Sequence, residues 1–292
     1  MNTFKEELIK EIKDKRPRLS DNSIKTYISS LVSINKKLDG DKNIDWFDKN
    51  SKEIIEYLEK GNSKTSKTIL SAIFILTGNS DIHQQMIKLS TEVNDEYKTN
   101  KKTDKQTDNW LSSNEIKEIY DTYYNKTINI LKQKIINKKD TEIIIEYILL
   151  GFLSGHLTPP RRSLDYALMK IRNFDEETDN YYKKGICYFN TYKTKDVYGK
   201  QSLTVPKELN DILKKWVKVN QTDYMLFSSI GKGLNSSQIT KILNKIFGLN
   251  VSTSMLRHIY LSDKYSQVEE NMKKDAVLMG HNSSTQSQYI VK

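Results

Sequence analysis

The stretch EIIIEYILLGFLSG, residues 142–155, is strongly apolar and follows the helix-starting residue Asp140. Pro159 and Pro160 come soon after it and end any helix that runs through it. A helix that is apolar on all sides is buried in a domain, and this one is too short to span a bilayer. We therefore expect it to form the buried centre of a domain.

The segments around this helix predict a mostly helical domain with a small antiparallel sheet, covering residues 110–292. Upstream, Ser112 or Ser113 caps a helix that has a partly polar extension towards Lys139. Downstream, YALMKI (166–171), GICYFNTYKT (185–194) and QSLTVP (201–206) have the pattern of short strands. The last two bracket a lysine-rich turn, as in a hairpin. Further helices are expected at 207–219, 236–247, 253–264 and 271–279.

A second domain is expected before a polar linker. The segment KTNKKTDKQTDN (98–109) contains no apolar residue, so it predicts an extended basic linker. Its lysines suit either a tether along a phosphate backbone or a solvated hinge. Residues 1–97 contain helical patterns at 19–38, 51–60, 63–76 and 81–98, which together predict a compact helical bundle.

Charge and cysteine content narrow the function classes. The chain has 292 residues and a net charge of +10. Residues 1–100 carry +1 of this charge and residues 101–292 carry +9, which favours a polyanionic partner for the second domain. Cys187 is the single cysteine, so no disulfide framework or thiolate zinc site is expected. The charged N-terminus is unlike a signal peptide, and we expect an intracellular protein that is neither secreted nor bound to a membrane.

Residues suited to DNA cleavage gather near the end of the sequence. SMLRHIY (254–260) contains Arg257 and His258, LMGHNSS (278–284) contains His281, and Tyr289 follows. Cleavage of a phosphodiester without a metal requires positive donors on the phosphate oxygens, a nucleophile, a base and an acid. Arginine suits the first role because its guanidinium group grips phosphate with two hydrogen bonds. This order of residues predicts a site in which a phenol attacks a DNA phosphate.

These residues resemble the tyrosine recombinases, the phage-integrase family. The resemblance implies a helical core-binding domain followed by a catalytic domain. In the family an arginine precedes an acidic residue by three positions, which fits Arg162 and Asp165. Arg161 does not fit this spacing and is the alternative to Arg162. A family lysine in a turn between strands matches Lys193, with Lys195 as the alternative. The catalytic residues implied by the resemblance are Arg162, Lys193, Ser254, Arg257, His281 and Tyr289.

The resemblance implies a site-specific recombinase, most simply the integrase of a virus or other mobile element. Tyr289 would form a 3′-phosphotyrosyl link and Lys193 would protonate the leaving oxygen, with no metal, ATP or other cofactor. Double-stranded DNA and a homotetramer on that DNA are the implied partners. Because only three residues follow Tyr289, we expect a monomer in the absence of DNA. Its compartment would be that of the target DNA, either a prokaryotic cytoplasm or a host nucleus or viral factory.

Ser254 departs from the family pattern, which places a histidine there. Serine is a poor base, so the proton of Tyr289 would pass to His281, to water or to His258. A type IB topoisomerase and a DNA-binding protein that has lost catalysis are the alternative functions, and a carboxylate-based metal nuclease leaves little trace in a sequence. Other lysines suit phosphate contacts or solvated helix faces: Lys25, Lys64, Lys67, Lys101, Lys102 and Lys195.

Overall fold

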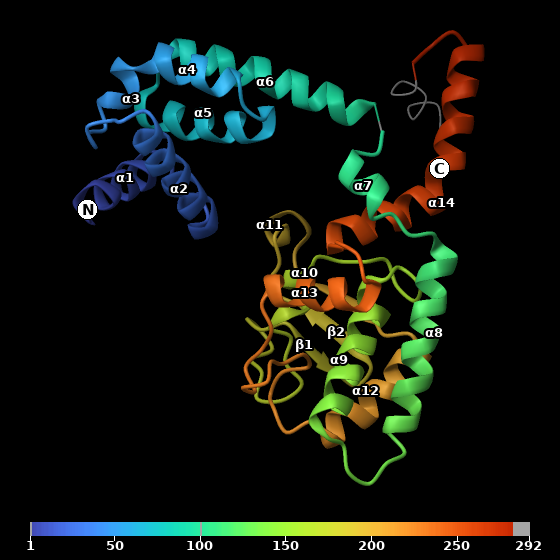
Figure 1. Cartoon of the computed structure of the whole chain (residues 1–292). Helices are drawn as coiled ribbons and strands as arrows, with labels where there is room; N and C mark the ends of the chain where they lie inside the picture. The colour runs from blue at the N-terminus through green and yellow to red at the C-terminus, as the bar shows by residue number, and fades with distance from the viewer. Residues whose placement is uncertain (1, 100, 283–292) are drawn as a thin grey trace. The chain divides into compact units, whose positions relative to one another are not determined.

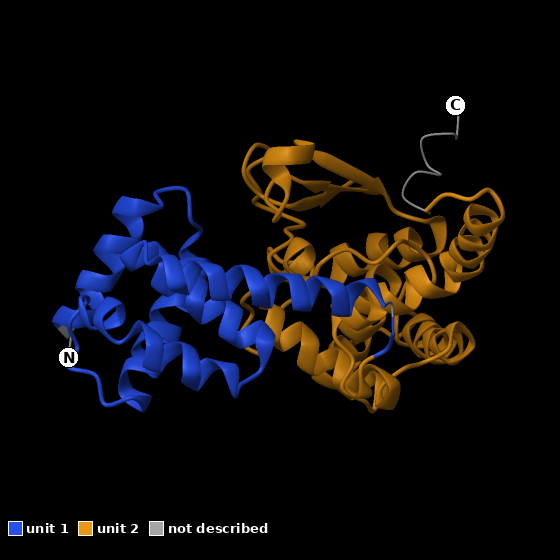
Figure 2. Ribbon diagram, turned by 90° about the horizontal axis from the view of Figure 1, so that it is seen from above, with its two compact units in different colours: residues 1–102 blue, residues 103–292 orange. Residues whose placement is uncertain are grey.

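The computed structural model describes residues 2–99 and 101–282 (Figure 1). The chain divides into two compact units, Met1–Lys102 and Thr103–Lys292 (Figure 2). Each unit has its own cluster of buried apolar side chains. The described residues are mainly helical with one small antiparallel sheet, as the sequence predicts. No helix among them combines the length and apolar character that a membrane crossing requires.

Unit 1 is built from helices packed around α5. Its helices are α1 (Asn2–Lys15), α2 (Asp21–Lys37), α3 (Trp46–Lys49), α4 (Ser51–Glu59), α5 (Ser63–Thr77) and α6 (Ser80–Lys98). The side chains of Ser20, Asn62 and Asn79 cap α2, α5 and α6, and Gly78 ends α5 in the left-handed conformation. The four helices predicted for this region are therefore confirmed.

Two helices of unit 1 were not predicted. In α1, Phe4, Leu8 and Ile12 recur every fourth residue and are buried against the rest of the unit. The many charges of this segment hide that stripe in the sequence, because they occupy the opposite, solvated face. In α3, Trp46 and Phe47 are buried, and their rings meet edge to face.

The segment predicted as an extended linker contains a short helix, α7 (Asp104–Asp108). It forms because Thr103 and Gln106 each accept a hydrogen bond from the other's backbone N–H, a reciprocal capping box. The unit boundary, between Lys102 and Thr103, falls inside the predicted linker. At the far end of this segment, the Asn109 side-chain oxygen accepts a hydrogen bond from the backbone N–H of Asn250, at 2.7 Å. The segment after Lys102 is therefore part of unit 2.

The centre of unit 2 is the apolar helix predicted from residues 142–155. It is α9 (Lys138–Leu153), and its residues 144–153 are all buried. Asn137 and Asp140 form a capping box at its start, so it begins two residues before Asp140. The preceding helix, α8 (Ser113–Ile130), is capped by Ser112 and ends well before the predicted extension towards Lys139.

The sheet of unit 2 has three antiparallel strands in the order β1-β2-β3. They are β1 (Tyr181–Lys183), β2 (Ile186–Phe189) and β3 (Gln201–Thr204). The predicted hairpin is confirmed as β2 and β3, and their connection contains α11 (Lys195–Tyr198).

The predicted strand at 166–171 is wrong. Tyr166 and Ala167 belong to α10 (Ser163–Ala167), and Lys170 alone forms isolated bridges, to Tyr181 and Tyr224. Alternating burial continues through Met169 and Ile171, but it arises from a helical turn followed by an irregular segment. The strand β1 was not predicted.

Three helices complete unit 2. The predicted helices α12 (Lys207–Val219) and α13 (Ser236–Phe247) are confirmed. The two helices expected at 253–264 and 271–279 form one continuous helix, α14 (Thr253–Leu278). No glycine or proline interrupts residues 264–272, and ion pairs from Lys273 to Glu269 and from Lys274 to Glu270 support the helical spacing.

Cys187 provides a chemical probe of the unit 2 core. It lies in β2, is fully buried, and burial raises the pKa of its thiol far above the ordinary value. Only the thiolate attacks a disulfide reagent. We expect native protein to react with Ellman's reagent at least about a thousandfold more slowly than denatured protein, because exposure requires unfolding of a stable domain. Rapid labelling in native buffer would contradict this burial.

Candidate functional site

The candidate site is centred on Asp165, a buried carboxylate in α10. Its side chain is 3% exposed, and its Oδ2 atom accepts a hydrogen bond from Nε of Arg161 at 2.9 Å. Nη1 of the same guanidinium group donates to Oε1 of Gln201 in β3, also at 2.9 Å. The guanidinium carbon lies 4.0 Å from the ring centre of Phe189 and 5.2 Å from that of Tyr192. Arg161 is therefore held in one position by contacts from three segments of the chain.

The charges of two further arginines also act on Asp165. Burial raises the pKa of this carboxyl, because it disfavours the charged form. Three positive charges oppose the rise, and they belong to Arg161, Arg162 and Arg257. The second oxygen, Oδ1, is buried without a hydrogen-bond partner in the described part of the chain. The positive charges of three arginines thus act on one carboxylate, and only Arg161 contacts it directly.

The two arginines that the sequence predicts for phosphate binding are the ones whose guanidinium groups have no polar contact in the described part of the chain. Arg162 is the half-buried residue immediately before α10, and Arg257 is half-buried in the second turn of α14. Within residues 2–99 and 101–282, neither guanidinium group forms an ion pair or a hydrogen bond. Arg161, which the predicted spacing excludes, is the one that neutralises Asp165. Its separation of four residues from Asp165 is the signal in the sequence that indicates this pairing.

The start of α14 presents its polar residues beside an apolar anchor. Met255, Leu256 and Ile259 are buried and fix this end of the helix in the core, while Ser254 and His258 are exposed. The backbone N–H groups at a helix N-terminus carry partial positive charge, which adds to that of Arg257. Ser254 and His258 are four residues apart and lie on one side of the helix.

The predicted lysines lie in the connection between β2 and β3. Lys193 is exposed and Lys195 is half-buried at the start of α11. Neither forms an ion pair with any described residue. The preceding residue, Tyr192, lies under the Arg161 guanidinium group and donates a hydrogen bond from its hydroxyl to the carbonyl of Gly199, at 2.7 Å. Tyr192 therefore joins the lysine-bearing connection to the arginine site.

The structure places His281 far from Arg257. Arg257 lies near the start of α14, and His281 follows its end at Leu278, after roughly 32 Å of helix. Residues 261–271 are all exposed, and Figure 1 shows the C-terminal half of α14 extending away from the other helices of unit 2. The continuous helix is the physical reason for this separation. Tyr289, the predicted nucleophile, lies outside the described residues.

The lysines predicted to contact DNA from unit 1 and the linker differ in their surroundings. Lys64 forms an ion pair with Glu96 at 3.0 Å, and its Nζ atom lies 4.7 Å from the ring centre of Tyr97, so its charge is already partnered. Lys25 is exposed and Lys67 is half-buried. Lys101 and Lys102 are exposed beside the unit boundary.

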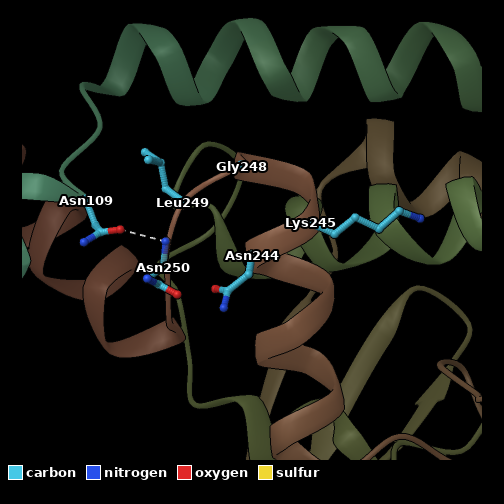
Figure 3. Close-up of a pocket in the computed structure, with 6 residues that line it drawn as sticks. All are labelled: Asn109, Asn244, Lys245, Gly248, Leu249 and Asn250. Carbon is cyan, nitrogen blue, oxygen red and sulfur yellow. Dashed lines mark hydrogen bonds between the residues drawn. The ribbon is translucent and has the colours of Figure 1, made fainter.

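A polar hollow of about 390 Å³ lies beside the loop that leads into α14 (Figure 3). Its walls include Asn109, Asn244, Lys245 and Asn250. The Lys245 ammonium group is held by Glu146 at 2.7 Å, so the hollow lacks a free cation from this residue. None of the predicted catalytic residues lines it.

Comparisons with protein-family models and with curated proteins give no match for this chain. Within the described residues, no three or more His, Cys, Asp or Glu side chains gather in a way that would hold a metal ion. The arginine site and the β2–β3 connection beside it are therefore the features of the structure that bear on function.

Replacing Asp165 with alanine tests the pairing at the centre of the site. We expect Asp165→Ala to lower the free energy of unfolding by about 3 kcal/mol, because it leaves the partly buried Arg161 without its counterion. Denaturant titration of unit 2 provides the measurement. The control is Asp121→Ala, which removes an exposed ion pair with Lys117 and should change stability by less than about 1 kcal/mol. Equal effects of the two substitutions would contradict a structural role for the Asp165 pair.

Proposed function

We propose that this protein is a site-specific DNA recombinase, an integrase that cuts and rejoins strands through a 3′-phosphotyrosyl intermediate. The observation that carries the proposal concerns the guanidinium groups of Arg162 and Arg257. They form no ion pair or hydrogen bond in the described part of the chain, and their charges act on the buried Asp165 carboxylate. Two such groups suit the non-bridging oxygens of one phosphate, because each offers paired donors and keeps its charge. The positive charge of the chain supports DNA as the source of that phosphate.

The proposed reaction is a transesterification. The Tyr289 oxygen forms a bond to phosphorus as the bond to the DNA 5′ oxygen breaks, and Arg162 and Arg257 neutralise the charge that develops on the phosphate. Lys193 supplies a proton to the leaving oxygen, with Lys195 as the alternative donor. The proton of Tyr289 passes to His258 or to water, because α14 separates His281 from Arg257. Attack by a free 5′-hydroxyl reverses the steps.

The energy of the broken bond is kept in the phosphotyrosyl ester, so the proposed reaction consumes no ATP. Recombination exchanges strands between two duplexes. The proposed working form is therefore a homotetramer on double-stranded DNA, assembled from monomers. Ser254 would contribute a hydrogen bond to phosphate rather than act as a base.

A second candidate function is DNA binding without cleavage. Two observations favour it: Ser254 stands where a histidine is expected, and α14 separates His281 from Arg257. Such a protein would keep the arginine site for phosphate binding and form no covalent intermediate. The two candidates differ in whether a covalent adduct appears.

The covalent step is tested with nicked DNA that traps the intermediate. We expect wild-type protein to form a protein–DNA adduct that survives denaturing electrophoresis, and Tyr289→Phe to abolish it, because phenylalanine has no attacking oxygen. Arg257→Lys should reduce the adduct at least about a hundredfold, since lysine cannot bind phosphate through two parallel hydrogen bonds.

The matched control is Tyr265→Phe, which removes the hydroxyl of a half-exposed tyrosine in α14. This variant should form the adduct at the wild-type level. An undiminished adduct in Tyr289→Phe would overturn the nucleophile assignment. DNA binding without an adduct on several target sequences would favour the second candidate.

The lysines of the β2–β3 connection are tested by the salt dependence of DNA binding. Each lysine that contacts phosphate adds about one unit to the slope of log K against log salt concentration. If Lys193 contacts phosphate, we expect Lys193→Gln to reduce the slope by about one. If Lys195 is the contact instead, the same reduction is expected for Lys195→Gln. Lys117→Gln in α8 should leave the slope unchanged, and an unchanged slope in both test variants would remove this connection from the interface.

A further inference from the structure

Two exposed apolar side chains form the tip of the β2–β3 connection. Val197 is 73% exposed and Tyr198 is 66% exposed, and both lie in α11. Lysines flank them at 193, 195 and 200, and Asp196 is the single acidic residue among positions 190–200. Lys200 is paired with Glu177, whereas Lys193 and Lys195 have no ion-pair partner in the described part of the chain. The tip is therefore apolar with basic flanks.

The backbone of this tip is held by hydrogen bonds that do not involve its apolar side chains. The N–H groups of Val197 and Tyr198 donate to the carbonyl of Thr194 at 3.1 and 3.2 Å, and that of Gly199 donates to Lys195 at 2.7 Å. Gly199 has φ of 67° and ψ of −160°, a conformation available essentially to glycine alone. The tip is therefore an ordered turn whose apolar side chains remain in water and add little to the stability of the fold.

The base of the connection is tied to the candidate site. Tyr192 lies against the Arg161 guanidinium group, and its hydroxyl closes the turn by donating to the Gly199 carbonyl. A DNA phosphate held by Arg162 and Arg257 would therefore have this tip on the same face of the duplex. The free lysines supply charge complementary to DNA, which selects a nucleic acid over an apolar protein partner.

We propose that Val197 and Tyr198 act as a wedge that enters the DNA minor groove and separates two stacked base pairs near the cleaved phosphate. This inference rests on the proposed function. A turn with two side chains at its tip suits the minor groove, which is about 6 Å wide. Apolar wedges of this kind unstack a base step and kink the duplex. Flexible pyrimidine–purine steps would be favoured, because they are unstacked at least cost.

The test compares binding of the full-length chain to two duplexes of the same sequence, one fully paired and one with a central mismatch. A mismatch lowers the cost of unstacking, so wild-type protein should bind the mismatched duplex about tenfold more tightly. The double variant Val197→Ser/Tyr198→Ser should bind both duplexes equally. The control is Ile230→Ser, which replaces an apolar residue that is 75% exposed in another loop of unit 2 and should keep the wild-type preference.

The outcomes separate the wedge from the proposed function. If the double variant keeps the wild-type preference for mismatched DNA, the wedge is wrong while DNA binding stands. A loss of preference in Ile230→Ser as well would also overturn the wedge, because the effect would not be specific to α11. If wild-type protein binds neither duplex, both the wedge and the proposed function fail.

Discussion

The arrangement of unit 2 around the candidate site depends on the ion pair between Asp165 and Arg161. A carboxylate that is 3% exposed is stable only with a counterion, and Arg161 supplies it. The same guanidinium group reaches Gln201 in β3 and lies over Phe189 in β2. One ion pair thus joins the loop after α9 to the sheet, while Arg162 and Arg257 form no ion pair or hydrogen bond in the described part of the chain.

The candidate site is assembled from three separate parts of unit 2. The turn at α10 provides the carboxylate and two arginines, the N-terminal turns of α14 provide Arg257, and the β2–β3 connection provides the lysines and the apolar tip. Each part has its own anchor in the core: Tyr166 in α10, Leu256 in α14 and Phe189 in β2 are all fully buried. Buried anchors of this kind hold polar groups at fixed positions without using the polar groups themselves for packing.

Predictions from the sequence succeeded where local pattern and local capping agree. The helices α12 and α13 have strong apolar stripes, and Asn235 caps α13, so their extents follow from residues close together in the chain. The prediction failed for 166–171, where alternating burial arises without a ladder of hydrogen bonds. It also failed within α14, whose middle, residues 261–271, has no buried side chain and is followed by local ion pairs that support the helical spacing.

The sequence by itself determined the helical class of both units, the β2–β3 hairpin, the excess of positive charge and the identity of the candidate arginines. Only the tertiary structure decided which arginine is neutralised, because Arg161 is selected by Gln201, forty positions away, and by a buried carboxylate. It also decided that His281 lies at the far end of α14 from Arg257. Helix and turn formation depend on neighbouring residues, whereas the pairing of a buried charge depends on which distant segments exclude water around it.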